Sequence, residues 1–189
     1  MAVVGLLDEA QAPLTAKRYF ADGDPGPIVA SLAHVPELLE AAMPFLGTVF
    51  GPSALSFRTK EIIVLRTSRL QSCRYCTETH TVVAREAGLS IDEVRALRDE
   101  GAPEAIDDPA EVALVGWVDA VAGSLQAPSN DVEEAVRRHF SDSEVIEATM
   151  LIGATMMLTR YATSLQLPTS EDTLQRLREE GFPTGGDLQ

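Results

Sequence analysis

Both cysteines of the 189-residue chain fall in one short segment, SCRYCTETH, which spans residues 72–80. Cys73 and Cys76 are separated by two residues, and His80 follows four positions after the second cysteine. A thiolate is both a nucleophile and a metal ligand, and an imidazole exchanges protons near neutral pH. The spacing therefore predicts either thiol redox chemistry or metal binding at this segment.

A helix over this segment would bring the three side chains together. We expect Ser72 to be its N-cap and Gly88 to be its stop. Cys73 would then lie in the first turn, where free backbone N–H groups and the positive end of the helix dipole stabilise a thiolate. Cys76 and His80 would share its face, at the i, i+4 spacing that lets a thiol pass its proton to an imidazole, directly or through one water.

Glu61 is a candidate partner for this histidine. Residues 56–70, SFRTKEIIVLRTSRL, are predicted to form a buried helix that pairs with the cysteine helix as an antiparallel hairpin. Glu61 and His80 would then lie about 15 and 14 Å below the turn, because each helical residue rises 1.5 Å. A carboxylate there would orient the imidazole. The alternative is that Glu61 only complements the dipole near the start of its own helix.

Zinc is the main alternative to redox chemistry, with Cys73, Cys76 and His80 as ligands and Glu61 as a fourth. However, structural zinc sites usually take a second ligand pair from another segment, and the other two histidines are isolated. We therefore expect no metal and no bound cofactor. Tyr75, between the cysteines, either lines the pocket or has an ordinary packing role. A thioredoxin-type fold is disfavoured, because the CxxC lies in helical sequence without a βαβ pattern.

Helix signals recur along the whole chain, and strand signals are nearly absent. We expect an all-α, single-domain helical bundle over residues 1–189, with a core at about 25–180 and a loose C-terminal tail at 182–189. Seven to nine helices of usual length fit this span. The expected starts and stops are Pro36 in a first turn, the N-caps Ser90, Asn130 and Ser141 with Glu93, Glu133 and Glu144 three residues on, and the stops Gly101 and Gly181.

The amino-acid composition limits the kinds of molecule and surface that the chain can bind. The chain has 29 acidic and 15 basic residues, a net charge of −14 that disfavours nucleic acid and anionic membrane surfaces. The N-terminal sequence has no basic region or apolar run of the signal-peptide kind. A close cysteine pair without such a signal is typical of a reducing compartment. We therefore expect a cytoplasmic protein that does not span a membrane.

Residues 61–94, EIIVLRTSRLQSCRYCTETHTVVAREAGLSIDEV, resemble the alkylhydroperoxidase D-like members of the carboxymuconolactone decarboxylase family. Members of this group share a Glu, a CxxC twelve residues later, a His four residues after the second Cys, and an Ala-x-x-x-Gly ending. The chain has matching residues at Glu61, Cys73, Cys76, His80, Ala84 and Gly88. It departs from the founding type at Tyr75, where that type has a second histidine.

The resemblance implies an all-helical fold that assembles into trimers or hexamers, and a thiol-dependent peroxidase or disulfide oxidoreductase activity. Cys76 would attack the hydroperoxide, and Cys73 would resolve the product as a Cys73–Cys76 disulfide. His80 would be the base, with Glu61 in the proton relay. A dithiol electron-donor protein or a low-molecular-weight thiol would reset the pair. The alternative is a carboxymuconolactone decarboxylase-like enzyme acting on a small cyclic or acidic metabolite.

Overall fold

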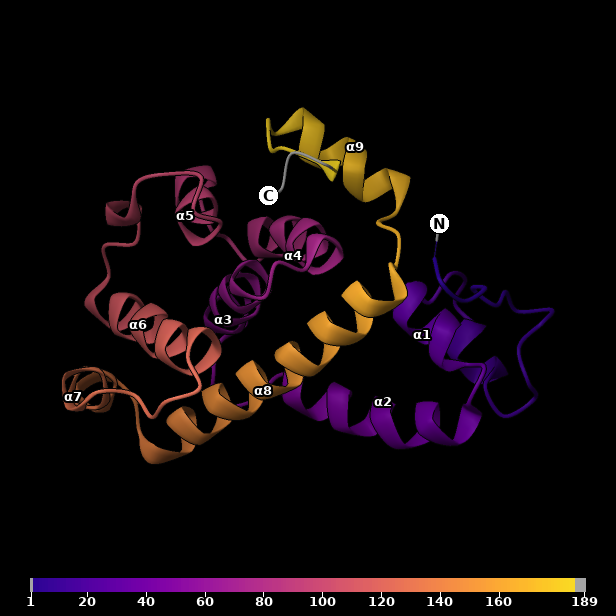
Figure 1. The fold of residues 1–189 in the computed structure, drawn as a ribbon, viewed down its shortest axis with the longest axis horizontal. Coiled ribbons are helices and arrows are strands. Elements are labelled where there is room, and N and C mark those ends of the chain that lie inside the picture. Colours follow the sequence, from indigo (N-terminus) through magenta and orange to yellow (C-terminus); the bar gives the residue numbers. More distant parts are fainter. Residues whose placement is uncertain (1, 186–189) are drawn as a thin grey trace.

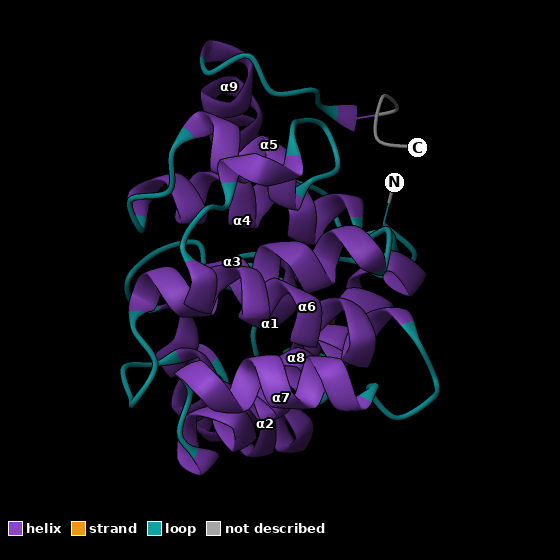
Figure 2. Cartoon of the chain, turned by 90° about the vertical axis from the view of Figure 1, so that its left-hand side faces the viewer, coloured by secondary structure: helices purple, strands orange, loops and turns teal. Residues whose placement is uncertain are grey.

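Every regular element in residues 2–185, the part of the chain that this computed structural model describes, is a helix (Figures 1 and 2). The all-α class predicted from the sequence is therefore confirmed. The α-helices are α1 (Pro27–Leu32), α2 (Pro36–Phe50), α3 (Phe57–Leu70), α4 (Arg74–Glu86), α5 (Ile91–Leu97), α6 (Pro109–Gly123), α7 (Asn130–His139), α8 (Asp142–Leu165) and α9 (Glu171–Glu179). Two short 3₁₀ helices cover Lys17–Phe20 and Pro103–Ala105.

The helix α3 lies at the centre of the fold and packs against α4, α6 and α8 (Figure 1). Four consecutive side chains, Ile62 to Leu65, are each at most 1% exposed. A helix buried on all sides has neighbours all round it, which agrees with the buried helix predicted over residues 56–70. Ser56 is its N-cap and accepts a hydrogen bond from the backbone N–H of Thr59. The segment with the two cysteines thus follows directly on a deeply buried helix.

Short polar residues start several helices where the sequence predicts them. Two capping boxes form, because each serine accepts a hydrogen bond from the N3 backbone and each glutamate side chain accepts one from the N-cap N–H. Pro36 occupies the first turn of α2. The two boxes are Ser90 with Glu93 and Ser141 with Glu144.

Two predicted helix boundaries outside the cysteine segment are wrong. The N-cap of α7 is Ser129 rather than Asn130, which is the first helical residue. The helix α5 ends at Leu97, well before the predicted stop at Gly101. Its end is set by Asp99, which takes a left-handed conformation with φ 59°. An aspartate can replace glycine there, since its short polar side chain tolerates that region.

The N-terminal part of the chain has a hydrophobic cluster of its own, beside α2 and the end of α8 (Figure 1). The core therefore begins before residue 25, the boundary predicted from the sequence. The backbone N–H of Val3 donates to Leu165 at 2.9 Å, and the hydroxyls of Ser31 and Tyr161 lie 2.9 Å apart, so this part is fastened to α8. The cluster consists of Ala12, Ala16, Phe20, Val29, Ala30, Ala33 and Leu39.

The segment after α9 also belongs to the core at its first residue. Phe182 is 4% exposed and packs in the main hydrophobic cluster, with the guanidinium of Arg98 5.1 Å from the centre of its ring. The tail predicted to be loose over 182–189 is therefore packed at its start. Residues 186–189 lie outside the described residues.

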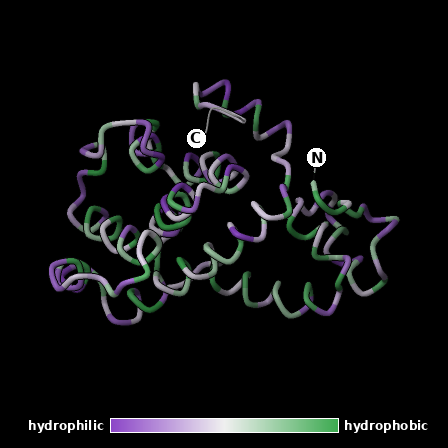
Figure 3. Tube along the Cα trace, viewed as in Figure 1, coloured by the Kyte–Doolittle hydropathy of each residue, from purple (hydrophilic) through white to green (hydrophobic). Residues whose placement is uncertain are grey.

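Hydropathy differs between the outer helices. Figure 3 shows hydrophobic residues along α2 and mainly hydrophilic ones on α7. Within residues 2–185, no helix combines the length and the apolar character that crossing a membrane requires.

Candidate active site

The turn between α3 and α4 positions the cysteine pair. The backbone N–H of Cys73 donates to the carbonyl of Ser68 at 3.0 Å, and that of Ser72 donates to Arg69 at 2.9 Å. Ser72 itself is left-handed, with φ 53°. These features form a Schellman motif, which ends a helix. Ser72 therefore ends α3. The prediction that Ser72 is the N-cap of α4 is wrong. The N-cap is Cys73.

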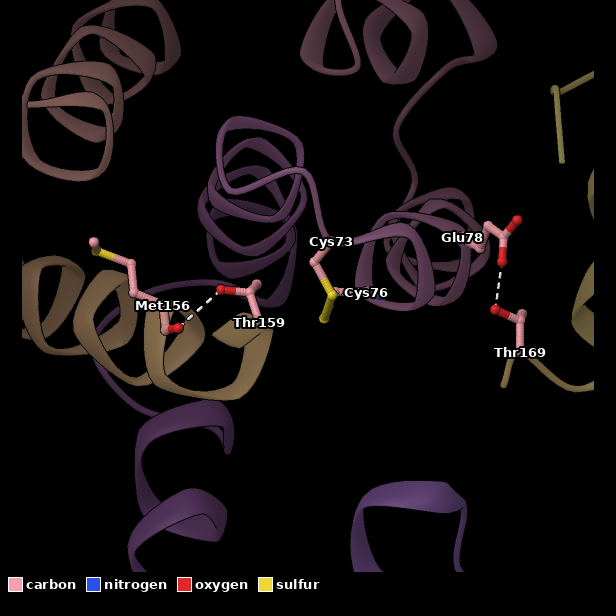
Figure 4. The surroundings of a disulfide bond; sticks show 6 residues. All are labelled: Cys73, Cys76, Glu78, Met156, Thr159 and Thr169. Atoms are coloured by element: carbon pink, nitrogen blue, oxygen red, sulfur yellow. Dashed lines mark hydrogen bonds between the residues drawn. A yellow bond between two sulfur atoms is a disulfide. The ribbon is translucent and has the colours of Figure 1, made fainter. Parts of the chain in front are cut away.

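Cys73 and Cys76 form a disulfide at the start of α4 (Figure 4). Their Cα atoms are 5.3 Å apart, within the usual range for a disulfide. The sulfur of Cys73 also accepts a hydrogen bond from the backbone N–H of Cys76 at 3.3 Å. Both residues are almost fully buried, at 1% and 5% exposure. When the disulfide is reduced, this N–H and the helix dipole favour the thiolate form of Cys73.

His80 and Glu61 meet across the α3–α4 hairpin. Nδ1 of the imidazole lies 2.9 Å from Oε2 of the carboxylate, and the two side chains are 25% and 6% exposed. The first turn of α3 contains no acidic residue, so Glu61 lies too deep in the helix to act chiefly on its dipole. The geometry thus favours the pairing alternative. The contact orients the ring through Nδ1, so Nε2 is the ring nitrogen that does not face Glu61.

Cys76 and His80 lie one helical turn apart on α4, at the i, i+4 spacing of side chains that share a face. The hairpin therefore presents the disulfide near the turn and the imidazole–carboxylate pair one turn deeper. The four residues singled out from the motif all belong to this hairpin: Glu61, Cys73, Cys76 and His80.

Tyr75 lies in the wall of a pocket of about 240 Å³ beside Cys73. Burial raises the pKa of Tyr75, the nearby carboxylate of Asp24 raises it further, and a hydrogen bond with Thr79 opposes the shift. The phenol therefore stays neutral at physiological pH. Tyr75 also packs against the hydrophobic cluster that contains Cys73 and Cys76, so both roles expected for it are seen.

The opposite face of α4 carries a buried polar network that sequence reasoning missed. Glu78 is fully buried and lies on the side of α4 away from the disulfide, where it accepts hydrogen bonds from Thr169 and from Gly185 N at 2.7 Å (Figure 4). Arg98 is also fully buried; it donates to Thr81 at 2.8 Å and to Pro183 O at 3.2 Å. Burial lowers the pKa of Arg98, although nearby carboxylates oppose the shift. This network fastens the C-terminal segment to the helix that carries the cysteines.

An ion pair made by a buried lysine also holds α3 in place. Lys60 is 2% exposed, and its Nζ lies 2.8 Å from Glu147 on α8 and donates to the carbonyls of Val49 and Gly51 at the end of α2. It therefore ties α2, α3 and α8 together next to Glu61. The sequence signal was only a basic residue near a helix start. Within residues 2–185, no cluster of three or more His, Cys, Asp or Glu side chains is arranged to hold a metal ion.

Comparison with known proteins places this hairpin in a family. The sequence model of the carboxymuconolactone decarboxylase family matches residues 36–120, which include α3 and α4. A crystal structure from Agrobacterium tumefaciens, of a protein of unknown function suggested to be the antioxidant defence protein AhpD, is 30% identical. That match covers 74% of this chain and 95% of the other, with a TM-score of 0.67. The chain belongs to the carboxymuconolactone decarboxylase family.

More distant structures share the family fold. A peroxidase-related protein from Ralstonia eutropha with an alkylhydroperoxidase AhpD core is 17% identical, with a TM-score of 0.80 over 91% of this chain and 94% of the other. The debrominase Bmp8, as a cysteine-to-alanine variant in complex with 2,3,4-tribromopyrrole, is also 17% identical, with a TM-score of 0.78 over 95% of this chain and 98% of the other. No curated protein matches the chain.

Proposed function

We propose that this family member is a thiol-dependent peroxidase that reduces hydroperoxides through Cys76 and Cys73. The observation that carries the proposal is the disulfide at the start of α4, on the same hairpin as the His80–Glu61 pair. A redox cycle needs two sulfurs within bonding reach and a nearby proton carrier. The hairpin supplies all three groups.

The proposed reaction has two steps. The thiolate of Cys76 attacks the distal oxygen of a hydroperoxide, the O–O bond breaks, and an alcohol leaves as Cys76 becomes a sulfenic acid. The thiolate of Cys73 then attacks the Cys76 sulfur, and the disulfide forms as the hydroxyl takes the proton that the Cys73 thiol gave up and leaves as water. His80 accepts the Cys76 proton through Nε2 and returns it to the leaving oxygen, while Glu61 holds the ring. An external thiol reductant resets the pair.

A stopped-flow experiment tests this proposal. Reduced protein, stripped of excess reductant, is mixed with one equivalent of hydroperoxide, and peroxide loss is followed together with the thiols. We expect Cys76→Ser to abolish the fast phase, and Cys73→Ser to keep it but to stop at a sulfenic acid. His139→Asn, at the end of α7 and outside the hairpin, is the matched control for His80→Asn. Peroxide loss in Cys76→Ser at the wild-type rate would contradict the proposal.

A second function is favoured by the fact that the His80–Glu61 pair does not depend on the sulfurs. We propose as the alternative a decarboxylase-like enzyme acting on a small cyclic or acidic metabolite, with His80 as the general base. Activity on such a metabolite that survives Cys73→Ser/Cys76→Ser but is lost in His80→Asn would favour it over the peroxidase.

We also propose that the protein is a homo-oligomer, a trimer or a hexamer. Large apolar side chains are exposed on α2 and α8, two helices that pack against each other, and burying them between copies of the chain would remove apolar surface from water. Light scattering coupled to gel filtration tests the assembly, and a monomer mass at micromolar concentration would contradict it. The exposed side chains are Leu38 and Phe45 on α2 and Ile146, Met150 and Met157 on α8.

A further inference from the structure

A small pocket borders the disulfide on the side of Cys73. The pocket of about 240 Å³ is lined by Cys73 but not by Cys76, and it is formed by the start of α4 and the end of α8. Attack on a disulfide depends on which sulfur the incoming thiolate reaches. The pocket therefore offers an external thiol a route to Cys73. Its other lining residues are Ser72, Arg74, Tyr75, Ala162, Thr163, Gln166 and Leu167.

Two matching turns build this pocket. The helix α8 ends as α3 does, because Leu167 N donates to Ala162 O at 3.0 Å and Gln166 is left-handed with φ 53°. Three non-glycine residues among residues 2–185 have a positive φ, and two of them, Ser72 and Gln166, line this pocket. Strained backbone of this kind gathers at functional sites. Each turn contributes two consecutive residues to the lining, Ser72 and Cys73 from one and Gln166 and Leu167 from the other.

A positively charged side chain, that of Arg74, lies at this pocket, although the protein as a whole is acidic. Arg74 is exposed, lines the pocket next to Cys73, and forms no ion pair with any residue that the structure describes. Most other arginines in residues 2–185 are paired, for example Arg66 with Asp99 and Asp119. An unpaired guanidinium at a small pocket favours a ligand with a negative charge.

We propose that a low-molecular-weight thiol bearing a negative charge enters this pocket and reduces the disulfide by attack on Cys73. The inference rests on the proposed function, because it names the reductant of the same cysteine pair. The volume of about 240 Å³ is below the usual range for drug-sized ligands, so the pocket suits a thiol of only a few heavy atoms.

The electron balance of this step uses groups already described. The donor thiolate forms a bond to the sulfur of Cys73, the Cys73–Cys76 bond breaks, and the electron pair leaves on Cys76, which takes a proton from His80. A second donor thiolate then attacks the donor sulfur of the mixed disulfide and releases Cys73 as a thiolate. The Cys76 N–H, 3.3 Å from that sulfur in the disulfide form, stabilises this leaving group. The sum is oxidation of two thiols to one disulfide.

Peptide mapping tests the site of attack. Wild-type protein oxidised with diamide is pulsed with 2-mercaptoethanol, quenched in acid and alkylated with N-ethylmaleimide. Trypsin cleaves after Arg69, Arg74 and Arg85, so Cys73 and Cys76 fall on separate peptides. We expect the mercaptoethanol adduct on the Cys73 peptide and the alkyl group on the Cys76 peptide. The reverse distribution would overturn the assignment.

Three small thiols of different charge test the role of Arg74. The rates of disulfide reduction by 3-mercaptopropionate, 2-mercaptoethanol and cysteamine are compared at equal thiolate concentration. We expect the anionic thiol to react about two- to five-fold faster than the neutral one, as for an exposed charge pair, and the cationic thiol to react slowest. The preference should vanish in Arg74→Gln and fade at high salt.

The control is Arg160→Gln, since Arg160 is an exposed arginine on α8 that does not line the pocket. An equal loss of preference in this control would overturn the role of Arg74, as would equal rates for the three thiols in wild type. Neither experiment uses peroxide. An adduct on Cys73 in a protein without peroxide turnover would therefore refute the peroxidase and leave the thiol site standing.

Discussion

His80 on α4 and Glu61 on α3 are joined by a 2.9 Å contact between Nδ1 and a carboxylate oxygen, 19 residues apart in the chain. Because the carboxylate comes from the most buried helix, it cannot turn away without disturbing the core. The ring orientation is therefore set by the fold rather than by the local sequence of α4.

This contact predicts the order of two substitutions. His80→Asn should lower the rate of peroxide consumption by about 100-fold or more, the usual contribution of a general base. Glu61→Gln should cost less, because the imidazole remains but is held less firmly. Both rates come from the stopped-flow assay, with circular dichroism as the check on folding. A larger loss in Glu61→Gln than in His80→Asn would contradict the assigned roles.

The buried position of Arg98 predicts that replacing it lowers the free energy of unfolding. Replacement by Met removes the ion pair with Glu100, 2.8 Å away, and the hydrogen bonds to Thr81 and Pro183 O, so we expect a loss of about 3 kcal/mol or more in the free energy of unfolding. Urea unfolding measures it. Arg95→Met is the control, since Arg95 contacts the same Phe182 ring from a less buried position and should cost much less.

Glu147 predicts a pH dependence. Burial alone would raise its pKa, but hydrogen bonds from Lys60 and Ser53 outweigh burial and lower the pKa below the ordinary 4.5. A carboxyl with a lowered pKa adds stability above its ordinary pKa, and that stability is lost as the pH falls through the lower folded-state value. Glu147→Gln should therefore lose about 1–3 kcal/mol at pH 7, and the gap to wild type should close as the medium becomes more acidic than about pH 4.

The exposed pair of Glu134 and Arg138 provides the contrast for that experiment. Glu134→Gln should change the free energy of unfolding by less than about 0.5 kcal/mol at any pH. Urea unfolding between pH 3 and pH 8 compares the two variants. A gap for Glu147→Gln that widened in acid would show that the ion pair is not the source of its stability.

The raised pKa of Tyr75 predicts a change of stability at alkaline rather than acidic pH. Its pKa is raised, chiefly by burial, so the folded state holds the phenol proton more tightly than the unfolded state does. That stability is complete below the ordinary pKa of about 10 and is lost as the pH rises through the higher folded-state value. Wild type should thus lose stability relative to Tyr75→Phe only at strongly alkaline pH. A difference in slope near neutral pH would count against this account.

Ser72 predicts a gain in stability. Its φ of 53° costs a residue with a Cβ about 1 kcal/mol, which glycine does not lose. Glycine also has more freedom in the unfolded chain, so Ser72→Gly should raise the free energy of unfolding by no more than about 1 kcal/mol. Ser72→Ala keeps the Cβ and should give no gain. Equal effects of the two substitutions in thermal unfolding would show that the turn is unstrained.

The parts of this molecule that the sequence predicts are those governed by local rules. The capping boxes at Ser90 and Ser141 follow from residues three positions apart, and the hairpin that brings Glu61 to His80 follows from helical rise. The prediction for Ser72 is wrong because a serine before a helix is usually an N-cap. Only the hydrogen bond from the backbone N–H of Cys73 to the carbonyl of Ser68 shows that the preceding helix ends at Ser72.

The features that could not be predicted from the sequence depend on contacts between residues far apart in the chain. Arg98 stands in a polar stretch that reads as a helix end at the surface, yet Thr81 and Pro183 enclose it. Phe182 is a single aromatic residue in a tail rich in glycine and proline, and its burial depends on the path of the chain after α9. No local pattern encodes either contact.

Cys73 closes one helix and opens the next, so the sulfur–sulfur bond spans a ring of only four residues that the turn has already ordered. A crosslink over so few residues restricts the unfolded chain far less than one that joins distant segments. The disulfide therefore adds little to the stability of the fold. The proposed redox cycle could open and close it repeatedly without unfolding the protein.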